Sequence, residues 1–347
     1  MSIYSETFER PLMRQVLSRC SELNIPVQMA LELTYRCNLR CSHCYIDLER
    51  GDELTLQEWK DVLDQLKAEG AIYLLFTGGE IMVRPDFLEI AAYARRNGFI
   101  PGFLTNSTLV TPGIARDIAD LRPFSVGTSL HGAAAATHEQ VTRVPGSFEK
   151  TLEGIRLLIN AGLEVIVHTL VMKSNVNELN QIEQLVELLG AKSHINMEIA
   201  PTKTGANSPL ELEPEEEKLA LSSWRPAEQE NVGTVRPVLC KAGKSLGSIS
   251  PNGDVFPCIM FPLKLGNVKQ TSFSSIWRTE SCAELRYLRS MTHRDLHACN
   301  DCGLKEYCQR CTGIAYLESG HSNGISPSAC KQAMVRWRLS QAAEVIE

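Results

Sequence analysis

Residues 27–45, VQMALELTYRCNLRCSHCY, join an apolar run to three closely spaced cysteines, Cys37, Cys41 and Cys44. The run VQMALEL (27–33) is predicted to form a buried strand. Tetrahedral zinc takes four protein ligands, and no fourth cysteine lies nearby in the sequence. A C-x3-C-x2-C loop can instead hold three irons of a cubane cluster. The fourth iron then stays open for a ligand that is not protein.

Composition excludes several classes of protein. The chain has 347 residues, 44% of them hydrophobic and 22% charged, and a formal net charge of −6. This balance gives no basic field for nucleic acid. No apolar run reaches the roughly 18 residues of a membrane-spanning helix, and the polar beginning of the chain is not a secretory signal. We therefore expect a cytoplasmic protein that engages neither nucleic acid nor membrane.

The cysteines are unevenly distributed. Of twelve, three lie at 37–44, eight lie between 240 and 330, none lies between 45 and 239, and Cys20 stands apart. Disulfide frameworks belong mainly to small secreted domains, which this chain does not resemble in length or in its beginning. Tight groups of cytosolic cysteines indicate metal ligands.

The cysteine-free middle alternates short apolar runs with amphipathic segments. Strands are predicted at 27–33, 71–76, 99–105, 124–130, 163–172 and 194–200, and helices are predicted to begin near Thr55, Pro85, Thr111, Ser147 and Asn175. Such repeats predict a parallel sheet with helices outside, here an open (β/α)6 partial TIM barrel of the α/β class. Chemistry in these folds gathers at the carboxyl ends of the strands, where the cysteine loop also falls.

The same pattern predicts four regions. They are an N-terminal helical extension (1–26), the partial barrel (27–200), a bridging region with a short helix around PEEEKLALSSW (201–238), and an irregular cysteine-rich domain that ends in a helix (239–347).

The three cysteines followed by Tyr45 resemble the signature of the radical S-adenosylmethionine (SAM) enzymes. The resemblance implies a [4Fe–4S] cluster whose open iron is chelated by the amino and carboxylate groups of SAM. Reductive cleavage of SAM then gives a 5′-deoxyadenosyl radical, which abstracts a hydrogen atom from the substrate.

Other segments at predicted strand ends are similar to the family's SAM contacts. TGGE resembles the segment that binds the SAM amino group, Arg143 resembles the arginine that pairs with the SAM carboxylate, and Ile199 is expected at the adenine. Asn106 and Ser129 are expected near the ribose. The implied cofactor-binding set is Gly78, Gly79, Glu80, Asn106, Ser129, Arg143 and Ile199.

The second set of cysteines resembles the SPASM domain, which holds two auxiliary iron–sulfur clusters, expected here as [4Fe–4S]. By that resemblance Cys240, Cys258 and Cys311 serve the first cluster, and Cys299, Cys302, Cys308 and Cys330 serve the second. Asn252-Gly253 predicts a hairpin that presents Cys258. The Cys308-x2-Cys311 spacing is one residue shorter than the common one. Paired C-x2-C motifs also occur in structural zinc sites, which is the competing interpretation.

The remaining polar residues near the strand ends have open roles. His131, His168 and Glu198 are candidates for proton carriers or for hydrogen-bonded structural positions. Cys20 is expected to be a small buried apolar residue. Cys282 is a candidate fourth ligand of the first auxiliary cluster.

The resemblance implies radical-based modification of a peptide substrate, as in maturation of ribosomally made peptides. Ile259 and Met260 follow Cys258 where the sulfatase-maturing branch has an acidic base, which argues against that branch. Alternatives are a tetrapyrrole-modifying enzyme of the haem-biosynthesis type and a zinc-stabilised interaction protein.

Two protein partners are expected. Only about 26 residues precede the first strand, too few for a leader-binding domain with its own core. A separate small leader-binding protein is therefore predicted, and the electron donor is expected to be flavodoxin or ferredoxin.

Overall fold

The computed structural model describes residues 11–46, 51–215, 240–278 and 282–344. Within them one nine-stranded sheet has the order β6-β5-β4-β3-β2-β1-β7-β8-β9. Neighbours from β6 to β7 are parallel, and β7-β8-β9 are antiparallel. The strands are β1 (Gln28–Thr34), β2 (Tyr73–Gly78), β3 (Ile100–Thr105), β4 (Val126–Ser129), β5 (Val165–Leu170), β6 (Lys192–Asn196), β7 (Leu246–Ile249), β8 (Asp254–Phe256) and β9 (Gly266–Asn267).

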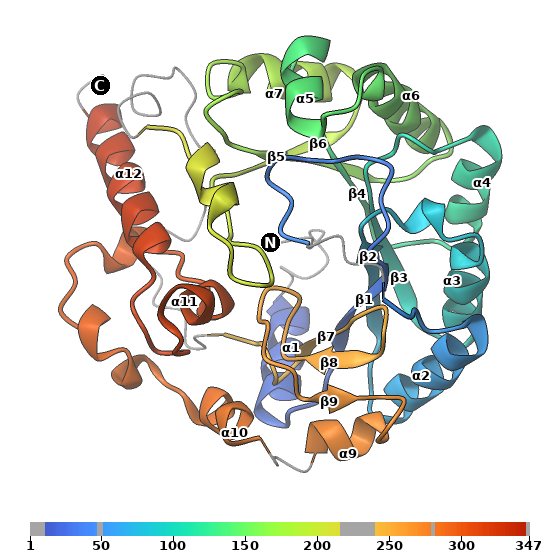
Figure 1. Ribbon diagram of the computed structural model, residues 1–347, viewed down its shortest axis with the longest axis vertical. Helices are drawn as coiled ribbons and strands as arrows, with labels where there is room; N and C mark the ends of the chain where they lie inside the picture. Colours follow the sequence, from blue (N-terminus) through green and yellow to red (C-terminus); the bar gives the residue numbers. More distant parts are fainter. Residues whose placement is uncertain (1–10, 47–50, 216–239, 279–281, 345–347) are drawn as a thin grey trace.

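Helices α2 to α7 follow one another around the outside of the curved sheet (Figure 1). The α-helices are α1 (Pro11–Glu22), α2 (Leu56–Ala68), α3 (Phe87–Arg96), α4 (Pro112–Asp120), α5 (Ala135–Thr142), α6 (Ser147–Asn160), α7 (Leu179–Leu188), α9 (Phe273–Arg278), α10 (Ala283–Ser290), α11 (Thr312–Ser319) and α12 (Pro327–Glu344). Short 3-10 turns span Ile81–Val83, Ser208–Leu212, His293–Asp295, His297–Cys299 and Lys305–Tyr307. The predicted partial barrel and the cysteine-rich C-terminal domain are both present. The predicted helix around PEEEKLALSSW lies largely outside the described residues.

Local capping explains where α2 and α4 begin. Thr55 forms a full capping box with Glu58, and Thr111 caps α4 with Pro112 in its first turn. The start near Ser147 is confirmed, since Ser147 is the first residue of α6, although it follows Gly146 at φ +77° and no side chain caps the helix. The start near Asn175 was wrong. Helix α7 begins at Leu179, and the Asn175 side chain bonds the backbone of His131, Leu170 and Met172 instead. Helix α5 was predicted as loop.

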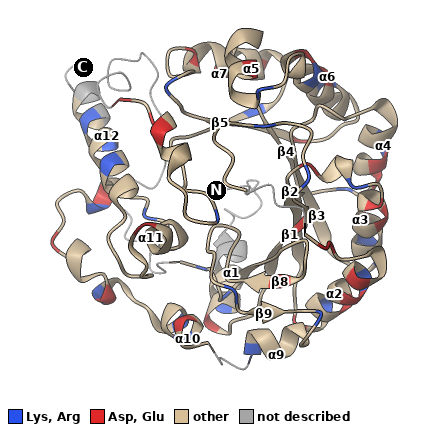
Figure 2. Ribbon diagram, viewed as in Figure 1, with Lys and Arg blue, Asp and Glu red and all other residues tan. Residues whose placement is uncertain are grey.

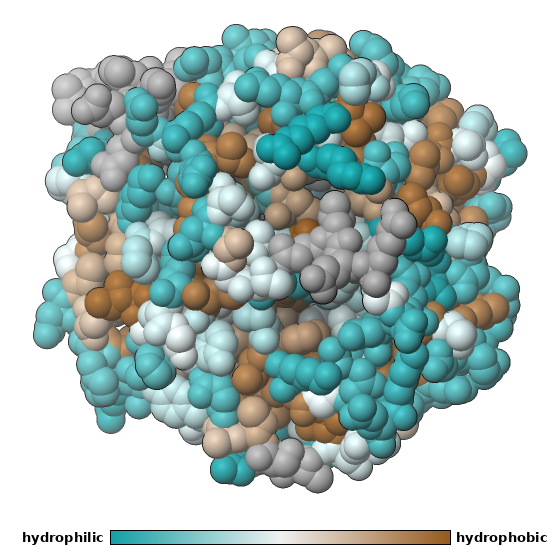
Figure 3. Space-filling model, viewed as in Figure 1, coloured by the Kyte–Doolittle hydropathy of each residue, from teal (hydrophilic) through white to brown (hydrophobic). Residues whose placement is uncertain are grey.

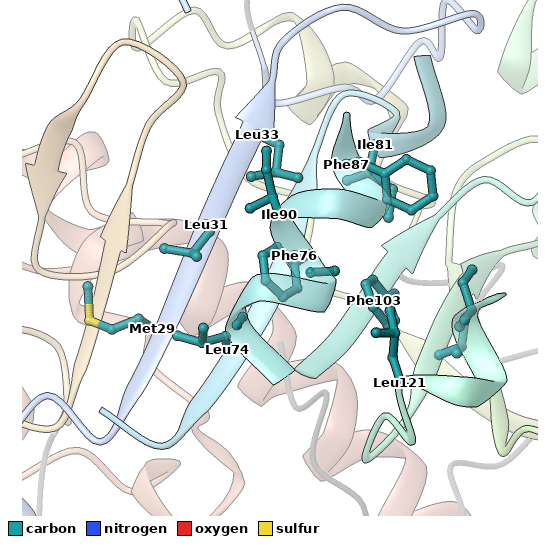
Figure 4. Close-up of a cluster of buried hydrophobic side chains, with 14 of the residues drawn as sticks. Met29, Leu31, Leu33, Leu74, Phe76, Ile81, Phe87, Ile90, Phe103 and Leu121 are labelled. Carbon is teal, nitrogen blue, oxygen red and sulfur yellow. The ribbon is translucent and has the colours of Figure 1, made fainter. Parts of the chain in front are cut away.

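The main core lies between the sheet and the outer helices. Alternate residues of β1 (Met29, Leu31 and Leu33) pack beside Leu74 and Phe76 of β2, as Figure 4 shows. The ring of Phe76 stacks on Phe103 of β3 at 5.6 Å between centroids. Because these residues face the helices, the intervening residues of the same strands face the interior of the arc.

The C-terminal domain continues the sheet of the barrel. Residues Gln28–Leu31 of β1 pair in parallel with Leu246–Ile249 of β7, and the Asn252-Gly253 turn joins β7 to β8 with Gly253 at φ +90°. Trp277 of α9 donates from Nε1 to the Asn24 carbonyl at 2.7 Å. The free edge of β1 is thereby covered by a strand from beyond residue 240.

The surface carries both signs of charge. Lys and Arg are interspersed with Asp and Glu around the outer helices (Figure 2), and hydrophilic residues cover much of the face in Figure 3, with hydrophobic ones between them. In the described part of the chain, every helix is too short or too polar to span a membrane.

Candidate active site

The first three cysteines lie on the loop that leaves the carboxyl end of β1. The Leu39 amide donates to Cys37 Sγ at 3.4 Å, and the Cys44 amide donates to the Cys41 carbonyl at 3.2 Å. The loop docks on the end of α5, where the Arg40 amide bonds the Thr142 carbonyl at 3.0 Å and the Ser42 amide bonds the Val141 carbonyl at 2.9 Å. Helix α5 therefore supports the cysteine loop.

The three sulfurs share one electrostatic environment. Burial, followed by the Cys44 and Cys37 sulfurs, raises the pKa of Cys41 to about 12, while the charge of Arg143 lowers it. Burial also raises the pKa of Cys37. Thiols held this way become thiolates when a metal replaces their protons. Three sulfur donors on one loop suit a cluster with one open iron.

The TGGE turn is fitted against the beginning of the cysteine loop. A Cβ on Gly78 would lie 2.2 Å from the Thr34 carbonyl oxygen, and one on Gly79 would lie 2.4 Å from the Arg36 oxygen. The amides of Gly79 and Glu80 donate to those same two carbonyls at 2.8 and 2.9 Å. The glycines are thus required by a close approach of backbone to backbone, which joins β2 to the cysteine loop.

Glu80 is fully buried, and its carboxylate holds two strand ends together. It accepts hydrogen bonds from the Met82 amide at 3.0 Å, the Asn106 amide at 2.7 Å and the Thr105 hydroxyl at 2.8 and 2.9 Å. Burial raises its pKa, although these bonds oppose the rise. Both carboxylate oxygens are therefore engaged by the protein itself.

Asn106 and Ser129 follow at the ends of β3 and β4. Asn106 Nδ2 donates to Asn38 Oδ1 at 2.9 Å and lies 3.8 Å from Cys37 Sγ, so it touches the cysteine loop directly. Ser129 is half-buried and pairs in register with His168 of β5. His168 lies beside Gly127, since a Cβ there would be 2.9 Å from His168 Nε2.

Arg143 and Ile199 reach the same region through α5. Arg143 ends that helix at φ +58°, is exposed, and acts electrostatically on Cys41. Ile199 lies three residues beyond β6, is 0% exposed, and packs with Val141 and Met172. The first-loop cysteines and the seven predicted SAM contacts therefore lie around the carboxyl ends of the strands.

Cys240, Cys258 and Cys311 form one group in the C-terminal domain. Burial and the Cys240 sulfur raise the pKa of Cys258 to about 11. Burial raises the pKa of Cys311 to about 12, with further contributions from Glu198, Cys240 and Cys258. These three cysteines, from distant parts of the chain, therefore lie close enough to interact electrostatically with one another, and Cys311 also interacts with Glu198.

Four further cysteines, Cys299, Cys302, Cys308 and Cys330, form a second group, and Cys282 belongs to neither. Burial raises the pKa of Cys308, and the Cys330 and Cys299 sulfurs add to it. The pKa of Cys330 is raised by burial and, to a smaller extent, by the Cys299 and Cys302 sulfurs. Among the cysteine sulfurs, the main interactions of Cys308 are thus with Cys330 and Cys299, whereas those of Cys311 are with Cys240 and Cys258.

Arg310 lies near cysteines of both groups. Its guanidinium donates to the Ser322 carbonyl at 2.6 Å and the Gly324 carbonyl at 2.7 Å. Burial lowers its pKa, while cysteines of both groups raise it. Within the described residues, no three or more His, Cys, Asp or Glu side chains are arranged around a single metal ion. A cubane differs from a single ion in taking its ligands on separate irons.

Three other residues singled out in the sequence have contacts or positions that the structure describes. Cys20 packs against a small apolar cluster of Leu17, Val27 and Tyr73. Cys282 precedes α10, and its carbonyl accepts a bond from the Arg286 amide at 3.1 Å. His131 follows β4 rather than lying on a strand.

A cluster of three histidines was missed by sequence reasoning. The buried ring of His131 lies edge-on to that of His43 on the cysteine loop, 4.5 Å between centroids, and stacks on that of His138 of α5 at 5.9 Å. Burial lowers the pKa of all three. The position of His43 next to Cys44 was a signal in the sequence that this histidine lies near the site. Its partners His131 and His138 are remote in sequence and gave no such signal.

A buried ion pair was also missed. Glu32 of β1 is 0% exposed, and Lys203 Nζ donates to its two oxygens at 2.6 and 2.5 Å. Tyr35 hydroxyl donates to Glu32 at 3.1 Å. A charged residue inside a predicted buried strand was the available signal.

Comparison with known proteins agrees with this geometry. The family model of the Radical SAM superfamily matches residues 31–189, and that of an iron–sulfur cluster-binding domain, SPASM, matches 240–303. An AdoMet-dependent heme synthase of Methanosarcina barkeri is 30% identical over 331 residues, covering 86% of this chain and 94% of that protein. The mycofactocin maturase MftC of Mycolicibacterium smegmatis is 31% identical over 328 residues, covering 87% and 82%.

Solved structures share the fold. SuiB of Streptococcus suis, bound to its precursor peptide SuiA, superposes with a TM-score of 0.65 at 15% identity, covering 95% of this chain and 82% of SuiB. The anSMEcpe enzyme with AdoMet and a peptide gives 0.65 at 15%, covering 92% and 99%.

An α/β partial barrel with a three-cysteine loop, joined to a cysteine-rich domain, defines an iron–sulfur enzyme. The chain belongs to the radical SAM superfamily and carries a SPASM domain. Its cofactors are a [4Fe–4S] cluster that binds SAM and auxiliary iron–sulfur clusters.

Proposed function

We propose that this enzyme modifies a ribosomally made peptide by radical chemistry. The observation that carries the proposal is that seven C-terminal cysteines form two groups, one of three and one of four. They do so in a chain that is similar over most of its length to the mycofactocin maturase MftC. The subtilosin biosynthesis protein AlbA of Bacillus subtilis is a further such relative, 28% identical over 320 residues.

The proposed ligands follow the three groups. Cys37, Cys41 and Cys44 would hold the SAM cluster, Cys240, Cys258 and Cys311 the first auxiliary cluster, and Cys299, Cys302, Cys308 and Cys330 the second. With all three sites filled as cubanes, the protein would bind about 12 iron atoms.

The chain's own residues would hold and orient SAM. When bound, the SAM cluster supplies the electron that converts SAM to the hydrogen-abstracting radical. We propose that Gly78, Gly79 and Glu80 shape the amino-group site through backbone they hold in place, and that Arg143 pairs with the carboxylate. Asn106, Ser129 and Ile199 would line the adenosine site, with Asn106 fixed against the cysteine loop.

The substrate would approach where the two domains meet. A shallow hollow there is lined by Tyr45, Lys203, Ile259 and Met260, among others. Tyr45 adjoins Cys44, and Ile259 and Met260 directly follow Cys258. The hollow has only about 10 Å³ of free volume, so it marks the junction between the SAM site and the first auxiliary site rather than a space for a substrate residue.

The test is turnover of a defined precursor peptide. Anaerobically reconstituted enzyme is incubated with SAM, a reducing system of flavodoxin or ferredoxin with its reductase, and precursor peptides from neighbouring reading frames. The expected result is 5′-deoxyadenosine together with a mass change in one peptide. The proposal is wrong if SAM is cleaved but every such peptide stays unmodified while another substrate class is converted.

A tetrapyrrole substrate is the second candidate, favoured by the similarity to the M. barkeri heme synthase over 94% of its length. Adding an iron-bearing porphyrin in place of peptide distinguishes the two. Conversion of its propionate side chains, followed by mass spectrometry, would replace the peptide proposal.

We also propose that a separate small protein presents the leader part of the precursor. Titration of the enzyme with full-length precursor, alone and with the partner, measures this. Tight leader-dependent binding by the enzyme alone would contradict it.

A further inference from the structure

One lysine stands among aromatic residues that adjoin two of the proposed metal sites. Lys203 Nζ lies 5.0 Å from the ring centroid of Tyr35, 5.7 Å from that of Tyr45 and 6.0 Å from that of Phe256. Tyr35 and Tyr45 flank the cysteine loop, and Phe256 comes two residues before Cys258. Each ring lies within the range in which a cation is attracted to an aromatic face.

The position of Lys203 is fixed by its own segment. Its backbone amide donates to the Tyr45 carbonyl at 2.8 Å. The turn around it is closed by the Ala206 carbonyl, which accepts from the Thr202 amide at 2.9 Å, and by the Thr202 hydroxyl, which accepts from the Ala206 amide at 3.0 Å. Lys203 is thus held by backbone to the end of the cysteine loop before its side chain makes any contact.

The ammonium group has a complete set of acceptors. Its hydrogen bonds go to both oxygens of Glu32, at 2.6 and 2.5 Å, and to the Tyr35 hydroxyl at 3.1 Å. Glu32 is 0% exposed and Lys203 is 21% exposed. Glu32 belongs to β1, the strand that pairs with β2 on one side and with β7 of the SPASM domain on the other.

A buried ion pair adds little net stability compared with apolar residues of the same shape, whereas its hydrogen bonds impose one geometry. We propose that Lys203 is a positioning residue that fixes the SAM-cluster loop relative to the first auxiliary site at Cys258. The inference rests on the ligand assignment proposed above and is independent of the substrate.

The test removes the pair without leaving a buried charge. In E32Q/K203M both charges are lost, and the matched control K60M/E89Q removes a Lys–Glu pair of 2.8 Å that also lies beside a tyrosine ring, Tyr93, at 5.7 Å. Both proteins are reconstituted, and their iron content and SAM cleavage are compared with those of the wild type. Hydrogen exchange is then followed in residues 34–46 and 255–262.

The expected result is retained iron and about tenfold faster exchange in both segments of E32Q/K203M, with no change in the control. The magnetic interaction between the reduced SAM cluster and the first auxiliary cluster, measured by electron paramagnetic resonance, is expected to change in E32Q/K203M alone. This second readout would not respond to a merely structural loss of stability.

The inference would be overturned if E32Q/K203M exchanged at the wild-type rate in both segments, if exchange were faster in only one of them, or if the magnetic interaction were unaltered. Absence of iron from the wild-type cysteine sites would instead refute the ligand assignment. If E32Q/K203M does not fold, K203R provides the same measurement, because a planar guanidinium keeps the charge but cannot reproduce the three-acceptor geometry. It is expected to change both segments by a smaller factor, and wild-type behaviour would count against the proposal.

Discussion

The cysteine loop of the barrel and the cysteine groups of the SPASM domain solve the same problem in different ways. Cys37, Cys41 and Cys44 come from one loop of eight residues, where burial raises the pKa of Cys37 and Cys41. The first auxiliary group instead joins Cys240, Cys258 and Cys311, from three distant parts of the chain. Spacing alone therefore defines the first site, whereas chain threading defines the second.

The support of the two sites differs as well. The barrel loop is held by backbone bonds to α5 and by the glycine turn after β2. Arg310 interacts electrostatically with cysteines of both auxiliary groups, and its guanidinium is fixed by the carbonyls of residues 322 and 324. The barrel loop is thus supported by backbone neighbours, whereas the two auxiliary groups share a nearby buried cation.

The largest expected effect comes from removing the local site. Replacing Cys37, Cys41 and Cys44 by alanine should remove about four iron atoms and abolish reductive cleavage of SAM, with the auxiliary signals retained. Iron analysis, chromatography of 5′-deoxyadenosine and electron paramagnetic resonance measure these. Cys20→Ala is the control, because Cys20 packs in an apolar cluster. Cleavage that survives the triple substitution would refute the assignment.

Threading of the auxiliary groups can be tested by non-additivity. Cys258→Ala and Cys311→Ala should each weaken the same spectroscopic signal, and the double variant should lose no more iron than either single one, because residues that act as a unit are not additive. Cys302→Ala should weaken the other signal. If Cys311→Ala instead matches Cys302→Ala, the interleaved grouping is wrong.

The glycine turn gives a smaller effect on the barrel side. Gly78→Ala places a Cβ 2.2 Å from the Thr34 oxygen at φ +136°, and should lower the free energy of unfolding by about 2–5 kcal/mol. Gly98→Ala is the matched control, since its φ is +92° but nothing lies within 4 Å, and it should cost about 1 kcal/mol. Denaturant unfolding measures both. Equal losses would show that the contact with β1 is unimportant.

The smallest expected effect is on pH dependence. Burial lowers the pKa of His168 from its ordinary value of 6.5 to about 3. Between pH 6.5 and pH 3, the unfolded chain therefore binds a proton at His168 that the folded protein does not bind. Stability is therefore full above pH 6.5 and falls as the pH falls. Between pH 7 and pH 5, the free energy of unfolding of His168→Asn should fall by about 1–2 kcal/mol less than that of the wild type. Parallel pH profiles of the two proteins would contradict this.

The sequence by itself determined the elements whose signals are local. The apolar runs predicted the six parallel strands, Thr55 and Thr111 predicted two helix starts, and Asn252-Gly253 predicted the β7-β8 turn. The C-x3-C-x2-C spacing indicated the class of enzyme. These features depend on neighbours a few residues apart, so periodicity and capping are sufficient to reveal them.

Tertiary structure decided the features that need remote partners. Only folding pairs β7 with β1, engages both oxygens of Glu80 with donors after β2 and β3, and buries Glu32 against Lys203, 171 positions away. Helix α5 was missed because no side chain caps its beginning, and its end is held by the cysteine loop. Each of these depends on the free energy of bringing distant segments together, for which the local sequence carries no period or cap.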